Sequence, residues 1–141
     1  MSRLLVDTSG YAAFFRDHRG VRAAVQEASE VFLSPIVLGE LRSGFLKGGR
    51  PAENERQLGE FIASPRCSVP VLDNETAHRY AAIHDFLRRQ GTPVSPNDLW
   101  IAASAAQHGL TVITLDGVFD RIPQVLVRKF EPPGNPSPTR S

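Results

Sequence analysis

The sequence has very little cysteine and no long apolar run. Cys67 is the single cysteine of 141 residues, which excludes an intramolecular disulfide and a cysteine-based zinc site. We expect it to be a plain buried thiol that takes part in no chemistry. No segment approaches the roughly 20 apolar residues of a transmembrane helix, and the N-terminus lacks the basic-then-apolar layout of a signal peptide. These absences favour a cytoplasmic protein that does not bind a membrane.

The chain also has almost no excess of charge. It carries 16 Lys and Arg against 15 Asp and Glu, a formal net charge of +1, so its overall field does not indicate a nucleic-acid binder. Binding RNA or DNA would need a local basic patch. Each candidate patch also fits an ordinary solvated helix face, which is the commoner role of clustered Lys and Arg. The candidates are Arg42, Lys47 and Arg50; Arg16, Arg19 and Arg22; and Arg88 with Arg89.

The apolar residues form short runs that alternate with segments of helical spacing. The short runs suit buried strands and cover residues 4–6, 31–33, 69–72, 112–115 and 125–127. The helical segments cover residues 11–15, 22–28, 36–46, 51–62, 73–89 and 96 to about 109, and several start at proline or stop at glycine. This alternation predicts one domain of α/β class with a largely parallel sheet. Residues 132–141, PPGNPSPTRS, are predicted to be a flexible tail.

Acidic residues follow two of the predicted strands. Asp7 comes directly after residues 4–6, and Asp116 follows residues 112–115. Ligands of open α/β sheets bind outside the carboxyl ends of the strands, so acids there are candidate ligand-binding groups. Each also has a purely structural interpretation. Asp7, with Thr8 and Ser9, can cap the next helix, and Asp116 with Gly117 is a strong turn signal.

Two further acids fall inside predicted helices. Asp98 is the third residue of the helix that Ser95 caps, where a carboxylate also interacts favourably with the helix dipole. Glu40 lies about two turns inside a helix, among apolar neighbours and after the poor helix former Gly39. This setting suggests a helix face that approaches another group closely, although Glu40 could instead be exposed beside Arg42.

If these four acids converge, the cluster needs a cation. Clustered carboxylates repel one another and raise each other's pKa, and a divalent cation removes the conflict. Mg²⁺ and Mn²⁺ prefer oxygen ligands, and Mg²⁺ keeps several waters while accepting one or two carboxylates. Such a metal lowers the pKa of a bound water and can bridge a phosphate, which phosphodiester hydrolysis requires. The histidines offer no competing site, because none has metal-ligand spacing: His18, His78, His84 and His108.

Four stretches taken in order resemble a known family. LLVDTSG, PIVLGELRSG, PNDLWIAASAAQHGL and VITLDGVFDRI are similar to the motifs of the PIN domain, most closely those of the VapC-like ribonuclease toxins of bacterial toxin–antitoxin pairs. The resemblance extends to about Phe130 and implies a PIN-like nuclease domain over residues 1–131. It implies a three-layer α/β/α fold around a central, mostly parallel sheet. The implied activity is an endoribonuclease dependent on Mg²⁺ or Mn²⁺, in which metal-activated water cleaves RNA to leave 5′-phosphate and 3′-hydroxyl ends.

The resemblance also implies roles for individual residues. The implied catalytic acids are Asp7, Glu40, Asp98 and Asp116. Asp7 and Asp98 would bind the metal directly, and Asp116 and Glu40 would complete the site directly or through water. Thr8 and Thr114 would support the carboxylates by hydrogen bonds. RNA would be positioned by Arg42, Lys47 or Arg50.

One position departs from the family pattern. Many members carry a further acid where this chain has Val118. We therefore assign the fourth acid to Asp116, with Asp120 as a weaker substitute.

The resemblance further implies two protein partners. One is a second copy of the chain in a homodimer. The other is a small VapB-like antitoxin that occupies a groove of the toxin. Apolar residues at 11–15 and 45–46 could form the docking surface, although packing in the core is the commoner role of such residues.

Other functions fit the sequence less well. A phosphatase with Asp7 as covalent nucleophile would usually carry a second Asp two residues later, where this chain has Ser9. A phospho-receiver domain would need paired acids before the first helix. A catalytically idle PIN-like interaction module remains the non-enzyme alternative, and the presence of all four acids speaks against it.

Overall fold

A five-stranded parallel sheet lies at the centre of the computed structural model, which describes residues 2–132. The strand order is β3-β2-β1-β4-β5, and each neighbouring pair is parallel. The strands are β1 (Arg3–Val6), β2 (Glu30–Phe32), β3 (Cys67–Ser68), β4 (Thr111–Thr114) and β5 (Leu126–Lys129). The predicted α/β class with a mostly parallel sheet is therefore confirmed. The tail predicted for residues 132–141 lies, from residue 133 onward, outside the described residues.

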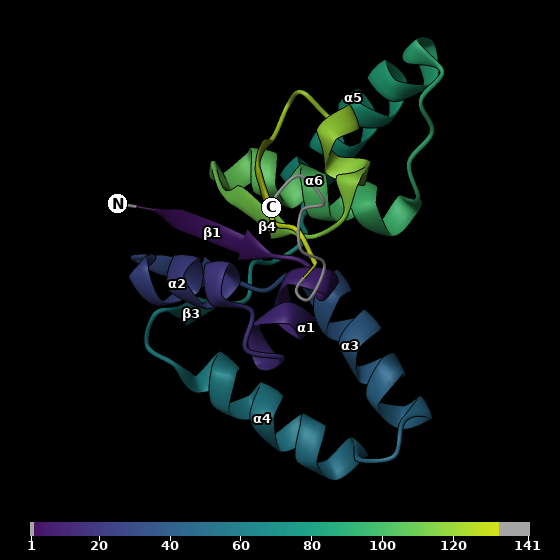
Figure 1. Cartoon of the computed structure of the whole chain (residues 1–141). Coiled ribbons are helices and arrows are strands. Elements are labelled where there is room, and N and C mark those ends of the chain that lie inside the picture. Colours follow the sequence, from purple (N-terminus) through teal and green to yellow (C-terminus); the bar gives the residue numbers. More distant parts are fainter. Residues whose placement is uncertain (1, 133–141) are drawn as a thin grey trace, which may run out of the picture.

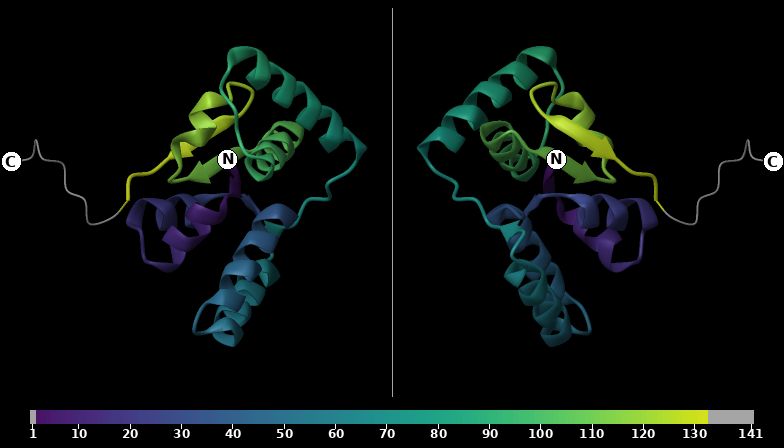
Figure 2. Two further views of the ribbon diagram at one scale, coloured as in Figure 1. Left: turned by 90° about the vertical axis from the view of Figure 1, so that its right-hand side faces the viewer. Right: turned by 90° about the vertical axis from the view of Figure 1, so that its left-hand side faces the viewer.

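Helices cover both faces of this sheet, which gives the expected three layers. One face carries α1 (Thr8–Phe15), α2 (Arg19–Glu27), α3 (Pro35–Lys47) and α4 (Pro51–Ala63), and the other carries α5 (Asn74–Gln90), α6 (Pro96–His108) and the short 3-10 helix η1 (Gly117–Arg121) (Figure 1). Figure 2 shows α3 and α4 side by side, projecting from the rest of the molecule. None of the helices in the described part of the chain is long and apolar enough to cross a membrane.

Local signals fix several helix ends as the sequence predicts. Ser34 and Ser95 cap α3 and α6 with their side chains, and proline begins each of these helices. Gly91 and Gly109 end α5 and α6 in the left-handed conformation, with φ of 70° and 65°. Glycine adopts this conformation without the steric cost of a Cβ.

The prediction of a strand at residues 69–72 is wrong. The chain pairs with β2 only at Cys67 and Ser68, and Pro70 then removes a backbone donor that a longer strand would need. Val69 and Val71 are 39% and 72% exposed, so this apolar run does not enter the core. Cys67 is a free, half-buried thiol whose pKa burial raises to about 11, in agreement with the unreactive thiol expected.

The other differences are shifts at element ends. The helix predicted at residues 11–15 begins earlier, at Thr8, because Asp7 caps it. The helix predicted at residues 22–28 spans Arg19–Glu27. The turn expected at Asp116 continues as η1.

The first helix packs unusually closely against the sheet. Strand β1 lies between β2 and β4 and is buried along Leu4, Leu5 and Val6. Immediately afterwards α1 begins, and a Cβ on Gly10 would lie 2.6 Å from the backbone oxygen of Ile113 in β4. Only glycine fits here without moving the backbone. This contact sets the position of the first turn of α1 relative to the end of β4.

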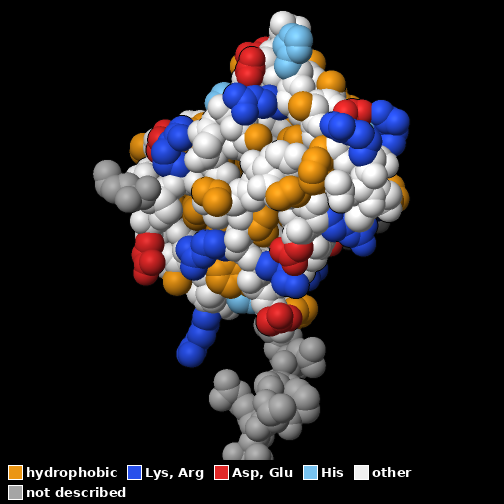
Figure 3. Space-filling view, turned by 90° about the horizontal axis from the view of Figure 1, so that it is seen from above, with side chains coloured by type: hydrophobic (Ala, Val, Ile, Leu, Met, Phe, Trp, Pro, Cys, Tyr) orange, Lys and Arg blue, Asp and Glu red, His pale blue; other side chains and the backbone are white. Residues whose placement is uncertain are grey.

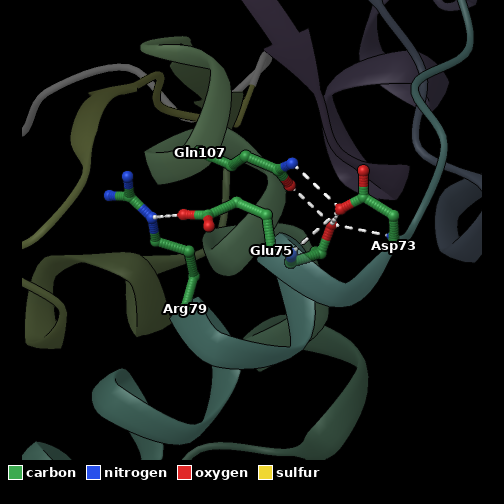
Figure 4. A network of polar contacts seen from close by, with 5 residues as sticks. Asp73, Glu75, Arg79 and Gln107 are labelled. Carbon is green, nitrogen blue, oxygen red and sulfur yellow. Dashed lines mark hydrogen bonds and ion pairs between the residues drawn. The ribbon is translucent and has the colours of Figure 1, made fainter.

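A polar network joins α5 to α6 (Figure 4). Asp73 caps α5 and accepts hydrogen bonds from the Thr76 amide at 3.2 Å and from Gln107 Nε2 in α6 at 3.1 Å. The Thr76 hydroxyl also contacts the Gln107 side chain. Glu75 and Arg79 form an ion pair on the outer face of α5. The network holds α5 against the C-terminal part of the helix that carries Asp98 at its other end.

We expect Gly10→Ala to destabilise the protein by about 1–3 kcal/mol, because the added methyl group meets backbone rather than a movable side chain. The matched control is Gly59→Ala in α4, where an added Cβ has nothing within 4 Å. Alanine should stabilise that exposed helix position by about 0.5–1 kcal/mol. Urea unfolding of both variants checks the prediction. Equal stability of the two variants would contradict the proposed close packing of α1 on β4.

Candidate functional site

Four carboxylates line one open hollow at the carboxyl end of the sheet. The hollow has a volume of about 530 Å³ and is also lined by Thr8, Ser9, Ala12, Arg16 and Ile101. Asp7 follows β1, Asp116 follows β4, Glu40 comes from α3 and Asp98 from the first turn of α6. The structure thus brings together all four predicted acids from four separate segments.

Asp7 has two roles in the local structure. It is only 5% exposed, and its Oδ1 accepts hydrogen bonds from the Gly10 amide at 2.7 Å and the Ser9 hydroxyl at 2.8 Å. Its Oδ2 accepts the Thr114 hydroxyl at 2.5 Å. Asp7 therefore caps α1 and lines the hollow at once, so the structural and the functional interpretations are compatible.

Burial makes the negative charge of Asp7 unfavourable. It raises the pKa of this carboxyl, hydrogen bonds from Thr114, Gly10 and Ser9 offset part of the rise, and the nearby charge of Asp98 adds to it. The three hydrogen bonds orient the carboxylate but leave its charge without a cation. An ion bound in the hollow would supply that compensation.

Glu40 is held by hydrogen bonds from two other helices. Thr8 donates its hydroxyl to Oε1 at 2.5 Å, and Asn97 donates Nδ2 to Oε2 at 3.0 Å. Arg42, the alternative neighbour, instead forms an ion pair with Glu55 of α4. Glu40 therefore lies at a close approach of α1, α3 and α6, as its sequence setting suggested.

Asp98 faces the same hollow from the start of α6. The Ser95 hydroxyl donates to its Oδ2 at 3.0 Å, and the Asp98 amide donates to Ser95 Oγ at 3.3 Å. Burial raises the pKa of Asp98, the Ser95 hydrogen bond lowers it in part, and the charges of Asp116 and Glu40 raise it further. Three of the four acids thus act on one another electrostatically at this position.

Asp116 makes the turn that its sequence predicts. Its Oδ1 accepts the Val118 amide at 3.0 Å, and its own amide donates to the Thr114 hydroxyl at 2.9 Å. Val118 is partly buried against the core. Asp120 lies 3.6 Å from Lys129 on the exposed side of η1 and does not line the hollow.

Two further residues of this site, Ser9 and Asn97, were not predicted from the sequence. Ser9 accepts the Leu115 amide at 2.9 Å and lies 3.2 Å from the Thr114 hydroxyl, so it joins α1 to the end of β4. Asn97 fixes one oxygen of Glu40. The available signal was their spacing: each lies within two residues of a predicted metal ligand.

The donor set of the hollow fits a hydrated divalent cation. Its acidic ligands are all oxygen donors, and the raised pKa values of Asp7 and Asp98 indicate charge that the protein does not neutralise. Within residues 2–132, no three His, Cys, Asp or Glu side chains already lie close enough together to enclose an ion. Mg²⁺ does not require such a cage, because it keeps several waters and binds one or two carboxylates directly.

The three basic residues predicted to position RNA have different surroundings. Arg42 is paired with Glu55. Lys47 lines a second open hollow on α3, which shares Glu40 with the first. Arg50 precedes α4 at the turn between α3 and α4. On the face seen in Figure 3, basic and acidic side chains mostly lie next to each other, so no field of one sign dominates that face.

Comparisons with known proteins identify relatives over most of the chain. The PIN domain family matches residues 4–125. The tRNA(fMet)-specific endonuclease VapC of Salmonella typhimurium is 36% identical over 103 residues, covering 72% of this chain and 76% of that protein. Ribonuclease VapC4 of Mycobacterium tuberculosis is 33% identical over 95 residues, covering 67% and 73%. The crystal structure of DNA-bound VapBC from Salmonella typhimurium matches with a TM-score of 0.80 at 30% identity, covering 92% of this chain and 98% of that one.

The raised pKa of Asp98 predicts a stabilising substitution. A carboxyl whose folded-state pKa is raised favours folding while it is protonated, and this contribution is lost as the pH rises through that pKa. Asp98→Asn stays neutral and can still accept from Ser95. We therefore expect it to raise the Tm of the metal-free protein at neutral pH, and the difference should vanish below about pH 4.

Asp73→Asn is the control of opposite sign. Hydrogen bonds from the Thr76 amide and from Gln107 and Thr76 side chains lower the pKa of Asp73, so its contribution is present at neutral pH and lost as the pH falls. This variant should have a lower Tm at neutral pH. Thermal unfolding across the pH range measures both, and a lower neutral-pH Tm for Asp98→Asn would contradict the idea of uncompensated charge.

Proposed function

We propose that this chain, which belongs to the PIN domain family, is a metal-dependent endoribonuclease, the toxin of a toxin–antitoxin pair. The relatives named as VapC ribonucleases support this activity. The observation that carries it is the convergence of four carboxylates on one open hollow. An open hollow suits a polymeric substrate, and its oxygen ligands suit the cation that phosphodiester hydrolysis needs.

In this proposal Asp7 and Asp98 would hold the metal directly, and Asp116 and Glu40 would complete the site directly or through water. Mg²⁺ or Mn²⁺, when bound, lowers the pKa of a coordinated water and stabilises charge on the phosphate. Thr114 and Thr8 orient the carboxylates of Asp7 and Glu40 by the hydrogen bonds already described.

Protein partners belong to the same proposal. A VapB-like antitoxin is supported by the VapBC complex among the structural relatives. Its proposed docking site is a groove beside the acidic hollow, with which it shares Ala12 and Arg16. The other residues that line the groove are Tyr11, Phe15, Leu41, Phe45, Asn54 and Gln57. A homodimer and a cytoplasmic location, where bacterial RNA is found, complete the proposal.

Cleavage of total bacterial RNA by antitoxin-free protein tests the activity. With Mg²⁺ or Mn²⁺ the wild type should cleave RNA, and EDTA, Asp7→Asn and Asp98→Asn should each abolish cleavage. Asn97→Ala should retain some cleavage but lose about 10–100-fold, as is typical when a hydrogen bond that orients a ligand is removed. Asp73→Asn, which changes a residue that does not line the hollow, should cleave at the wild-type rate. Cleavage that survives EDTA or Asp98→Asn would refute the assigned site.

Replacement of Phe15 tests the antitoxin groove. Phe15 is exposed and lines this groove, so Phe15→Glu should weaken binding of the co-expressed cognate antitoxin by at least tenfold, roughly 1.4 kcal/mol. Leu126→Glu, on the exposed face of β5, is the matched control and should bind normally. Isothermal titration calorimetry compares the two. Similar affinities for both variants would indicate that the antitoxin binds to another surface.

A further inference from the structure

One basic side chain, Arg16, lines the acidic hollow. Arg16 directly follows α1, and Thr8, Ala12 and Arg16 are spaced four residues apart, which places them along one side of the helix. Helical rise sets Arg16 about 12 Å from Thr8 along the helix axis. Ala12 lies between them and is small, so the surface from the carboxylates to Arg16 is not blocked by a long side chain.

The Arg16 backbone is fixed while its side chain has no partner. Its amide donates to the carbonyl oxygens of Ala12 and Ala13, both at 3.1 Å. Asp17 then turns the chain with a φ of 60°. Within residues 2–132 the Arg16 guanidinium forms no ion pair and no hydrogen bond, whereas Arg22 lies 3.5 Å from Asp17. The structure therefore presents an exposed cation at a defined place on the rim of the hollow.

Electrostatics explains why a cation is needed at that place. Four carboxylates repel an approaching RNA backbone, and one divalent ion compensates two of their charges. A guanidinium on the rim would attract a phosphate and bind it through two parallel hydrogen bonds. Arg42 is already paired with Glu55, which favours Arg16 over Arg42 for this role.

We propose that Arg16 is a substrate-positioning residue that binds a phosphate of the RNA adjacent to the one cleaved. The inference rests on the proposed endoribonuclease function. It assigns the phosphate contact to the C-terminal end of α1, whereas the resemblance pointed to α3 and the turn after it.

The test compares Arg16→Ala and Arg16→Lys with Arg19→Ala as the matched control. Arg19 is exposed at the start of α2 and lines neither the hollow nor the groove, so its replacement removes the same charge nearby. Binding is measured by fluorescence anisotropy of a labelled random-sequence RNA oligonucleotide, in the cleavage-silent Asp98→Asn background, over a series of KCl concentrations. Steady-state cleavage of an RNA that the wild type cuts gives kcat and KM separately.

Arg16→Ala should weaken RNA binding about 10-fold or more and raise KM, with a smaller change in kcat, because a charge-assisted contact is lost. The slope of log affinity against log salt should fall by about 0.7, the value for one phosphate contact on a single strand. Arg16→Lys should keep that slope and recover only part of the affinity. Thermal unfolding should give each Arg16 variant the Tm of its parent protein, since the Arg16 side chain has no partner among the described residues.

Three results would overturn the inference. Arg16→Ala could match Arg19→Ala in affinity and salt slope while the wild type still cleaves RNA, which would leave the proposed function intact. A fall in kcat with KM unchanged would assign Arg16 to the chemical step instead. A folded wild type that neither binds nor cleaves RNA would refute the endoribonuclease proposal, and the role of Arg16 with it. If Arg16→Ala proves unstable, Arg16→Gln, which keeps most of the stem, decides between the same outcomes.

Discussion

The rest of this site depends on the hydrogen bonds that the buried carboxylate of Asp7 accepts. It lies where β1 leaves the sheet, caps α1 through the Gly10 amide and accepts the Thr114 hydroxyl at the end of β4. One side chain therefore fixes the first helix, the two central strands and the wall of the hollow relative to one another. Gly10 completes this junction, because any Cβ there would push α1 away from Ile113.

The junction places the negative charge of Asp7 in a buried position, where a charged group is unfavourable. Asp7 is almost fully buried and Asp98 is close enough to raise its pKa. A parallel sheet buried on both faces supplies the stability that tolerates this arrangement, as is usual when function conflicts with folding. The proposed cation would compensate this unfavourable charge, so the stability lost in the metal-free protein and the proposed activity have the same origin.

Local sequence signals were sufficient to predict features that depend only on neighbouring residues. Ser34, Ser95, Gly91 and Gly109 predicted helix ends because capping and the left-handed conformation depend on neighbouring residues only. The strand expected at residues 69–72 failed because an apolar run does not reveal whether a neighbouring strand is available to pair with it, and Pro70 limits that pairing. Asn97 was missed because its partner Glu40 is distant in sequence.

By itself, the sequence determined the order of strands and helices, the acids at the strand ends and the resemblance that connects them, because these are properties of short segments. Only the tertiary structure decided that Arg42 is paired with an acid while Arg16 lines the acidic hollow. Arg42 and Arg16 look equivalent in the sequence, but the packing of α3 on α4 pairs Arg42 with Glu55. The end of α1 leaves Arg16 on the rim of the acidic hollow. Whether a basic side chain is free to bind a substrate depends on its distance from acidic side chains of other elements. These distances are set by how the helices pack on the sheet.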